Sequence, residues 1–141
     1  ELEAAWLRLA LPALDDDNAT RRRIAERCRA AAPHLAWAAS HPNHVYHLNV
    51  LRSPTRDAVR TQLAAAGIST GIHYPVAITR QPAFADLRAE TGQVRCPSAE
   101  SWSAECVSIP CFPEMTEDEV DALGAALSAL PDERSPEAAT R

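Results

Sequence analysis

Lysine is absent from this chain of 141 residues, and all fourteen of its basic residues are arginines. A guanidinium stays protonated and cannot form a Schiff base, whereas a lysine amine can do so once its pKa is lowered. Covalent chemistry on a lysine is therefore excluded within this chain. A reaction that needs such an amine requires another polypeptide segment to supply it.

Glycine is also scarce, and the four glycines lie far apart at Gly67, Gly71, Gly92 and Gly124. Phosphate-cradling loops of the G-x-G-x-x-G or Walker type need closely spaced glycines, so such nucleotide loops are excluded. The longest apolar run is shorter than the ~18 residues that span a bilayer, which excludes a membrane protein. A net charge of -5 and a pI near 5.5 oppose the basic surface that nucleic-acid binding requires. The length suits one folded core.

The four cysteines show no C-x-x-C spacing and stand at Cys28, Cys96, Cys106 and Cys111. No apolar signal segment stands at the start of the sequence, so we expect a reduced, cytoplasmic chain. An even number of cysteines is compatible with disulfides, but a chain of this length buries enough surface without them. Buried free thiols are the favoured interpretation.

Apolar residues at helical spacing open the sequence, with Trp6 and Leu9 on one face. A second helix is predicted over 15–32, and Pro12 is expected to kink or divide the two helices. Aspartates at the start of the second helix and arginines near its end follow the charge order that the helix dipole favours. Because the first residues already read as the inside of a helix, we expect a cut piece in which 1–32 links to an absent domain.

The rest of the pattern mixes short strands with helices and predicts an α+β fold over 33–130, a small sheet covered by helices. The run HVYHLNVLR, residues 44–52, has apolar residues at both odd and even positions, which is typical of a strand covered on both faces. The tail over 131–141 has nothing to bury, so we expect it to be disordered.

Capping residues and periodicity predict the other elements. A helix after Pro54 has Val59, Leu63 and Ala66 on one face and Gly67 as its left-handed cap. An extended segment over 68–74, helices over 83–90 and 97–106 and a strand over 107–109 follow it. A last helix begins with a capping box of Thr116 and Glu119, and its buried stripe consists of Val120, Leu123, Leu127 and Leu130. The last helix is the clearest of them, because its cap and its stripe agree.

Two side-chain groups suggest chemistry only weakly. His41, His44 and His47 invite a metal ion, but an odd spacing places His44 and His47 on opposite faces of the predicted strand, which disfavours a metal site. Cys111 and His73 would make a nucleophile and its base, although the sequence does not show that they approach each other. The apolar neighbours of Cys111 raise the pKa of its thiol and favour an inert residue.

The segment TGIHYPVAITRQPAF, residues 70–84, carries polar side chains that a core does not need. Pro75 stiffens the backbone after two hydrogen-bonding rings, and further donors follow. Such a loop suits an anionic, hydroxyl-rich ligand. The candidate ligand-binding residues are His73, Tyr74, Thr79, Arg80 and Gln81. The residues alone are equally compatible with a second interpretation, a capped turn around a core histidine whose hydrogen bonds are satisfied.

Three blocks, HVYHLNVLR, RDAVRTQLAAAGISTGIHYPVAITRQPAF and CPSAESWSAECVSIPCFPEMTEDEV, together resemble the carboxy-terminal region of the DegT/DnrJ/EryC1/StrS aminotransferases. The resemblance runs from Glu1 to about Leu130. It implies the small domain of a fold type I homodimer that depends on pyridoxal 5'-phosphate. Such enzymes transfer an amino group from glutamate or a similar amino-acid donor to a nucleotide-linked keto sugar.

In that family the cofactor-binding lysine and the phosphate-binding residues belong to the amino-terminal domain. The resemblance therefore assigns no catalytic, cofactor-binding or metal-binding residue to this chain, and it predicts that the chain alone is inactive. It places His73 and Tyr74 on the sugar-nucleotide side of the active-site cleft. Arg80 and Gln81 are weaker candidates for contacts with hydroxyl or phosphate groups.

The sequence departs from the family pattern at three positions. Ala77 stands where proline is usual, Thr79 where histidine is usual and Asn49 where an aromatic residue is common. The HYPV form resembles sugar 3-aminotransferases that act on thymidine-diphosphate 3-keto-6-deoxyhexoses. The loss of a titratable ring at Thr79 leaves the identity of the sugar open.

Two other functions stay open at this point. One is a dehydratase of the same fold in which histidine replaces the cofactor lysine. The other is a free-standing interaction module that uses the exposed faces of its first two helices. In either the fragment or the module, apolar surface is exposed, so we expect the isolated chain to self-associate.

Overall fold

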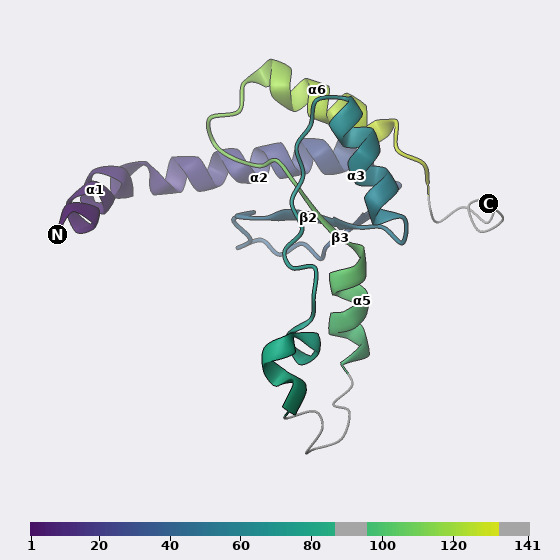
Figure 1. The fold of residues 1–141 in the computed structure, drawn as a ribbon. Coiled ribbons are helices and arrows are strands. Elements are labelled where there is room, and N and C mark those ends of the chain that lie inside the picture. Colours follow the sequence, from purple (N-terminus) through teal and green to yellow (C-terminus); the bar gives the residue numbers. More distant parts are fainter. Residues whose placement is uncertain (87–95, 133–141) are drawn as a thin grey trace.

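The computed structural model describes residues 1–86 and 96–132, and these form helices around a small antiparallel sheet (Figure 1). The helices are α1 (Leu2–Ala10), α2 (Leu14–Ala31), α3 (Arg56–Ala65), α5 (Pro97–Glu105) and α6 (Glu117–Ser128). Short 3-10 helices are η1 (Leu11–Ala13), η2 (Ile78–Arg80) and η3 (Pro82–Phe84), and the strands are β1 (Ala36–Trp37), β2 (Asn49–Arg52) and β3 (Cys106–Ile109). The predicted α+β class is confirmed.

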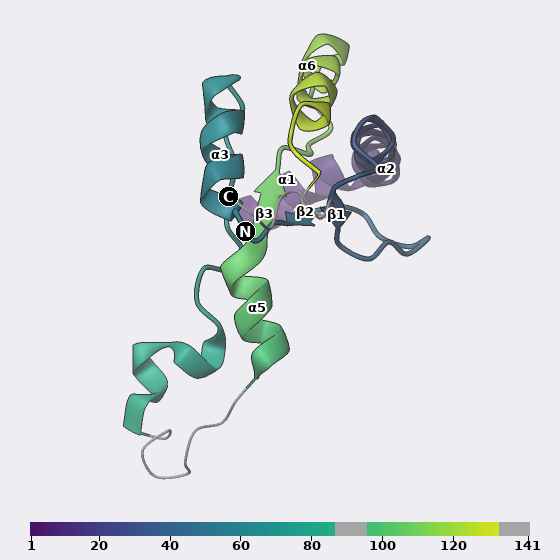
Figure 2. The same cartoon turned by 90° about the vertical axis from the view of Figure 1, so that its right-hand side faces the viewer.

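The sheet has the order β1-β2-β3, and both pairs of strands are antiparallel. Residues directly opposite in such a pair point to the same side, and successive residues alternate. The register therefore defines a core face, with Asn49, Leu51, Val107 and Ile109, and an opposite face, with Val50, Arg52, Cys106 and Ser108. Figure 2 shows α2, α3 and α6 on one side of the sheet, while α5 and the segment around η2 and η3 extend on the other.

The hydrophobic core lies between the core face and the helices α2, α3 and α6. The four predicted residues of the last helical stripe are 3% exposed or less, which confirms that prediction. Buried residues that join the same cluster from the other elements include Ile24 and Cys28 of α2, Val59 and Leu63 of α3, and Leu51 of β2. At the surface of this layer Arg27 of α2 forms ion pairs with Glu117 and Asp121 of α6.

Helix ends follow the predicted capping chemistry. The Thr116 hydroxyl accepts a hydrogen bond from the Glu119 backbone N–H, and the Glu119 carboxylate accepts one from the Thr116 N–H, as a capping box requires. Gly67 has φ +78° and ends α3 as predicted. The expectation for Ala66 is wrong: Ala66 is exposed because α3 ends at Ala65, and Ile68 packs against the core instead.

The predicted strand over 44–52 is too long, because only Asn49–Arg52 forms β2. Tyr46 has φ +51°, and its backbone N–H donates to His44 Nδ1 over 2.8 Å, so the chain turns here and leaves the strand geometry. Val50 and Arg52 are only half-buried, so the coverage of the second face is incomplete. The pattern also missed β1, whose two residues are too few to show any periodicity.

The premise used against a histidine metal site is wrong as well, since His44 and His47 do not share a strand. Within residues 1–86 and 96–132, no group of three or more His, Cys, Asp and Glu side chains is placed to hold a metal ion. The four cysteines are free thiols; Cys28, Cys106 and Cys111 are buried and Cys96 is half-buried. The interpretation as buried free thiols is thus confirmed for three of the four.

At the amino-terminal end α1 contributes nothing to this core. None of its residues is buried, and η1, which contains Pro12, separates it from α2 as expected. Figure 1 shows α1 and the first half of α2 as an arm that extends away from the sheet. Among the described residues no helix is long and apolar enough to cross a membrane.

Two predictions fall at the limits of the described chain. The helix expected over 83–90 corresponds to η3 and two following residues, and its second half lies outside the described residues. The disorder expected over 131–141 concerns residues of which all but the first two lie outside them as well.

Candidate ligand-binding site

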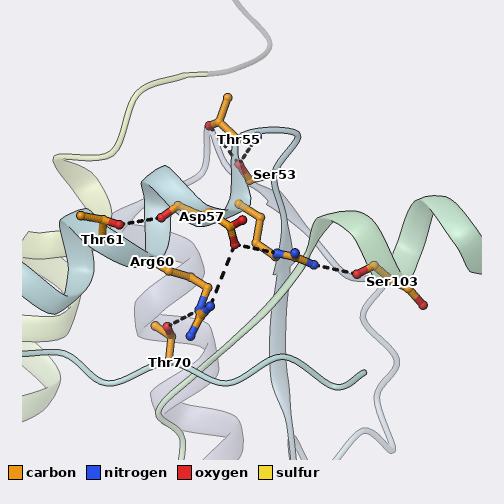
Figure 3. A network of polar contacts seen from close by, with 8 residues as sticks. Ser53, Thr55, Asp57, Arg60, Thr61, Thr70 and Ser103 are labelled. Atoms are coloured by element: carbon orange, nitrogen blue, oxygen red, sulfur yellow. Dashed lines mark hydrogen bonds and ion pairs between the residues drawn. The ribbon is translucent and has the colours of Figure 1, made fainter. Parts of the chain in front are cut away.

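The segment that leads to His73 is fixed to the rest of the fold before it reaches that residue. Arg60 of α3 donates from Nε to Thr70 Oγ1 over 3.3 Å, and its Nη1 lies 4.0 Å from Asp57 Oδ1 (Figure 3). Asp57 also accepts a hydrogen bond from Arg56, which in turn donates from Nη1 to the Ser103 carbonyl of α5. This network ties Thr70 to α3, and α3 to α5.

The next residue, Gly71, joins the sheet through its backbone. Its N–H donates to the Ser108 carbonyl, and the Ser108 N–H donates to the Gly71 carbonyl, each over 2.9 Å. Of the predicted extended segment over 68–74, only Gly71 pairs with the sheet, in a single antiparallel bridge to β3, and the segment forms no strand. The bridge holds the backbone of this segment at the edge of β3 that does not pair with β2.

His73 packs directly on that bridge. Its Nδ1 lies 2.9 Å from Ser108 Oγ, and a Cβ built on Gly71 would lie 2.6 Å from His73 Cε1. The ring is half-buried, whereas Ser108 is only 6% exposed. His73 is thus satisfied on one nitrogen and accessible in part, which differs from a fully buried core histidine.

Tyr74 and Gln81 line a surface hollow next to this histidine. The Tyr74 side chain is 70% exposed and meets the His73 ring edge-on, with the ring centroids 5.5 Å apart. Residues that line the hollow are Tyr74, Pro75, Val76, Gln81, Pro82 and Ala83. The hollow therefore brings together two of the five predicted residues, Tyr74 and Gln81, and His73 adjoins it through its contact with Tyr74.

Thr79 and Arg80 lie apart from that hollow, in η2. Arg80 forms a two-pronged ion pair with Glu100 of α5, with 3.0 Å from Nε to Oε1 and 3.0 Å from Nη2 to Oε2. The hydrogen bond and the charge of Glu100 raise the pKa of the Arg80 guanidinium. Arg80 is engaged within the fold and connects η2 to α5, which was not foreseen from the sequence. Thr79 is half-buried in the same turn.

The nucleophile and base pair considered for Cys111 and His73 does not form. Cys111 Sγ donates to the Arg21 carbonyl over 3.4 Å, while His73 contacts Ser108. Burial raises the pKa of the Cys111 thiol to about 11, and the nearby positive charge of Arg21 offsets only part of this effect. Both the burial of Cys111 and the raised pKa of its thiol favour the inert interpretation.

Sequence reasoning missed three residues that shape the site, namely Gly71, Glu100 and Ser108. Ser108 carried a signal, because it is a hydroxyl between apolar residues in a short strand, and buried hydroxyls need partners. The roles of Gly71 and Glu100 depend on contacts between distant segments, and nothing in their local sequence indicates them.

The residues present do not fit pyridoxal phosphate as a covalently held cofactor. The sequence has no lysine to form the imine, and its glycines make no phosphate-cradling loop. A cofactor of that kind would need residues from another segment. The described site offers a histidine, a phenol and an amide, which suit hydrogen bonds to hydroxyl groups.

Comparison with known proteins identifies the family to which the chain is similar. The model of the DegT/DnrJ/EryC1/StrS aminotransferase family matches residues 1–128. The erythromycin biosynthesis sensory transduction protein EryC1 of Saccharopolyspora erythraea is 37% identical over 92% of this chain and 36% of its own length. The dTDP-3-amino-3,6-dideoxy-alpha-D-galactopyranose transaminase of Aneurinibacillus thermoaerophilus is 36% identical over 91% of this chain and 35% of its own length.

The fold itself matches a solved structure over almost its entire length. The crystal structure of S. venezuelae DesV in complex with a ketimine intermediate superimposes with a TM-score of 0.79 at 30% identity. That match covers 98% of this chain and 36% of the DesV chain. This chain therefore spans about a third of the length of the proteins that it resembles.

Proposed function

Because this chain belongs to the DegT/DnrJ/EryC1/StrS aminotransferase family, we propose that it is the carboxy-terminal part of a sugar aminotransferase. The enzyme transfers an amino group from an amino acid, with glutamate as the leading donor, to a nucleotide-linked keto sugar. One observation carries this proposal above the others: 98% of the chain superimposes on DesV with a TM-score of 0.79. A chain that folded as an unrelated module would not reproduce a third of a transaminase in one piece.

The proposed substrate is a sugar with a keto group at carbon 3. The Aneurinibacillus relative is named for a 3-amino-3,6-dideoxy product, whose direct precursor is a 3-keto-6-deoxy sugar. His73, Tyr74 and Gln81 would face the sugar nucleotide, since Tyr74 and Gln81 line one hollow and the His73 ring meets the Tyr74 ring beside it. All three have hydrogen-bonding groups that the sugar hydroxyls can use. Arg80 would contribute through the position of η2 rather than by direct contact, because Glu100 already holds its guanidinium.

This proposal divides the enzyme into two parts. Pyridoxal phosphate supplies the electron sink for amino transfer, and residues outside this chain would hold it. This chain would contribute one wall of the cleft, with 33–130 as the small domain and 1–32 as its connection to the remainder. The exposed apolar surface of α1 supports that connection, and the absence of lysine supports the expectation that the chain alone does not catalyse the reaction. In the full-length enzyme we expect a homodimer.

A chimera tests the proposal. Residues 1–128 replace the matching segment of the Aneurinibacillus transaminase, and amino transfer is measured from glutamate to its dTDP-linked 3-keto-6-deoxy sugar. We expect activity. In the chimera, His73→Ala should lower kcat/KM for the sugar about tenfold or more, while the half-reaction with glutamate changes little.

The exposed His47 provides the matched control, and His47→Ala should leave both half-reactions unchanged. A folded chimera that accepts the amino group from glutamate but passes it to no nucleotide-linked keto sugar would refute the proposed substrate class. Loss of water from the sugar without amino transfer would favour the dehydratase alternative instead.

A further inference from the structure

Ser108 holds a central position under His73. Its backbone pairs with Val50 of β2 on one side and with Gly71 on the other, so neighbouring segments restrain it from both directions. Its side chain lies on the opposite face of the sheet, away from the helical core, and the residue is 6% exposed. The Oγ atom of Ser108 therefore has little freedom to move.

The hydrogen-bonding needs of Ser108 determine which nitrogen of His73 carries the proton. In the part of the chain that the structure describes, His73 Nδ1 is the only hydrogen-bond partner of Ser108 Oγ. If Nδ1–H donated to Oγ, the buried serine O–H would be left without an acceptor, which is costly. If Ser108 O–H donates to Nδ1, every group of the pair is satisfied, and the proton of the neutral imidazole must lie on Nε2.

From this geometry we infer that Ser108 and Gly71 are positioning residues that fix His73 as its Nε2–H tautomer and present that N–H as a hydrogen-bond donor. Nε2 has no partner among residues 1–86 and 96–132, and the ring is half-buried, so this donor is available to a ligand. An N–H donor at this place suits a sugar hydroxyl or a carbonyl oxygen. The part of this inference that concerns a ligand rests on the proposed function, whereas the part that concerns the tautomer of His73 does not.

Gly71 contributes by leaving room for the ring. A Cβ at this position would meet Cε1 at 2.6 Å, Nδ1 at 3.3 Å and Nε2 at 3.6 Å of the same imidazole. The backbone of Gly71 is not in the left-handed region, unlike that of Gly67, so an alanine here would have to displace the His73 ring but would not strain its own backbone. The close approach of ring and backbone thus sets the orientation that Ser108 completes.

The test measures the tautomer directly in the complete 141-residue chain labelled with 15N-histidine. Imidazole 15N shifts are recorded at a pH of about 8, where histidine is ordinarily neutral, and the His73 signals are identified by their loss in His73→Gln. We expect a protonated-type Nε2 and an acceptor-type Nδ1. A protonated Nδ1 in the unmodified chain would overturn the inference.

Two substitutions at Ser108 separate the hydroxyl from the shape of the side chain. Ser108→Ala should give averaged shifts of both tautomers, whereas Ser108→Thr, which keeps the hydroxyl on a strand that tolerates β-branching, should restore the original pattern. Unchanged His73 shifts in a folded Ser108→Ala chain would refute the positioning role.

Gly71→Ala should displace the ring and change the His73 shifts in the same experiment. Gly67→Ala is the matched control, because Gly67 has φ +78° and no atom within 4 Å of its added Cβ. That variant should lose stability without altering the His73 signals. Equal His73 shifts in Gly71→Ala and the unmodified chain would exclude a role for Gly71.

The chimera then connects the tautomer to the reaction. There Ser108→Ala should lower kcat/KM for the sugar about threefold to tenfold, with recovery in Ser108→Thr. If the tautomer is confirmed but the chimera has no sugar activity, the proposed function fails and the positioning role stands. If the chimera is active and Ser108→Ala has no effect on sugar turnover, the ligand-directed part of this inference is wrong.

Discussion

At the scale of single residues, Asn49 is the least satisfied side chain in the core. It is 0% exposed on the core face of β2, and neither polar atom of its amide has a hydrogen-bond partner among the described residues. A buried polar group without partners costs about 1–3 kcal/mol. Asn49→Leu, which keeps the branched arrangement of four heavy atoms, should therefore stabilise the fold by about that amount, measured as a higher urea midpoint.

Asn43 supplies the control for this prediction, because it is exposed in the loop before β2. Asn43→Leu should change the free energy of unfolding by no more than about 0.5 kcal/mol. A destabilised Asn49→Leu protein would contradict this prediction, because it would mean either that ordered water satisfies the amide or that the site has no room for the larger leucine side chain.

The thiols should differ sharply in reactivity. Burial raises the pKa of Cys28 to about 11, with the neighbouring Cys111 as a smaller cause, and burial raises that of Cys111 to about 11 as well. Cys106 is 0% exposed, and Cys96 is half-buried. Since the thiolate is the reactive form, Ellman's reagent at neutral pH should modify Cys96 first.

All four thiols should react once urea unfolds the chain. In the folded protein, Cys96→Ser should abolish the fast phase of thiol modification and leave the slow phase. Fast modification of Cys111 in the folded protein would contradict its assignment as an inert residue.

At the scale of elements, the contact between α5 and β2 depends on a carboxylate. Glu105 accepts hydrogen bonds from Ser101 over 2.8 Å and from Arg52 over 2.6 Å. The bond from Ser101 is the largest cause that lowers the pKa of Glu105, and Arg52 lowers it further. Because the pKa is lower in the folded state, this stabilisation is present above the ordinary carboxyl pKa of about 4.3 and is lost as the pH falls through the folded value.

Urea unfolding at pH 7 and at successively lower pH should therefore show a loss of stability in acid. Glu105→Gln should lower the midpoint at pH 7 and make its decline in acid shallower. A residual decline is expected from Glu119, whose pKa the Thr116 N–H lowers in the same way. Glu114→Gln, at an exposed position, serves as the control, and an acid decline that Glu105→Gln leaves unchanged would contradict this prediction.

At the scale of the whole molecule, α1, η1 and the start of α2 expose a large apolar surface. The exposed side chains of this segment are Leu2 (89%), Trp6 (67%), Leu7 (59%), Leu9 (81%), Leu11 (65%) and Leu14 (48%). A helix normally buries such an apolar face against another part of a core. The isolated chain should therefore self-associate, which light scattering detects as a molar mass that rises with concentration.

Replacing Leu2, Trp6 and Leu9 by glutamine should reduce that association. Glu3→Gln with Arg8→Gln is the control on the same helix, since it removes charge and leaves the apolar surface intact. A monomer at every concentration would count against the view that this arm is covered in the complete enzyme.

A structural feature could be predicted from the sequence when the residues that cause it are close together in the chain. The capping box at Thr116, the left-handed Gly67 and the stripe of α6 follow from residues a few positions apart, so they were predicted correctly. The strand over 44–52 was predicted too long, because the turn at Tyr46 interrupts an apolar run that looks continuous. For the candidate site, the sequence singled out the segment around His73, since its polar residues are unusual for a core, but it did not indicate which of them lie together.

The sequence by itself determined the class of the fold, the family and the absence of an imine-forming lysine, because composition and motifs specify these directly. Only the tertiary structure decided what surrounds His73. Ser108 and Gly71 come from segments 37 residues apart in sequence, and Arg80 forms an ion pair with Glu100. Asn49 is buried with no hydrogen-bond partner for its amide in the part of the chain that the structure describes. Each of these results depends on how β3, α5 and the helices pack together, and side-chain partners across such distances leave no periodic signal along the chain.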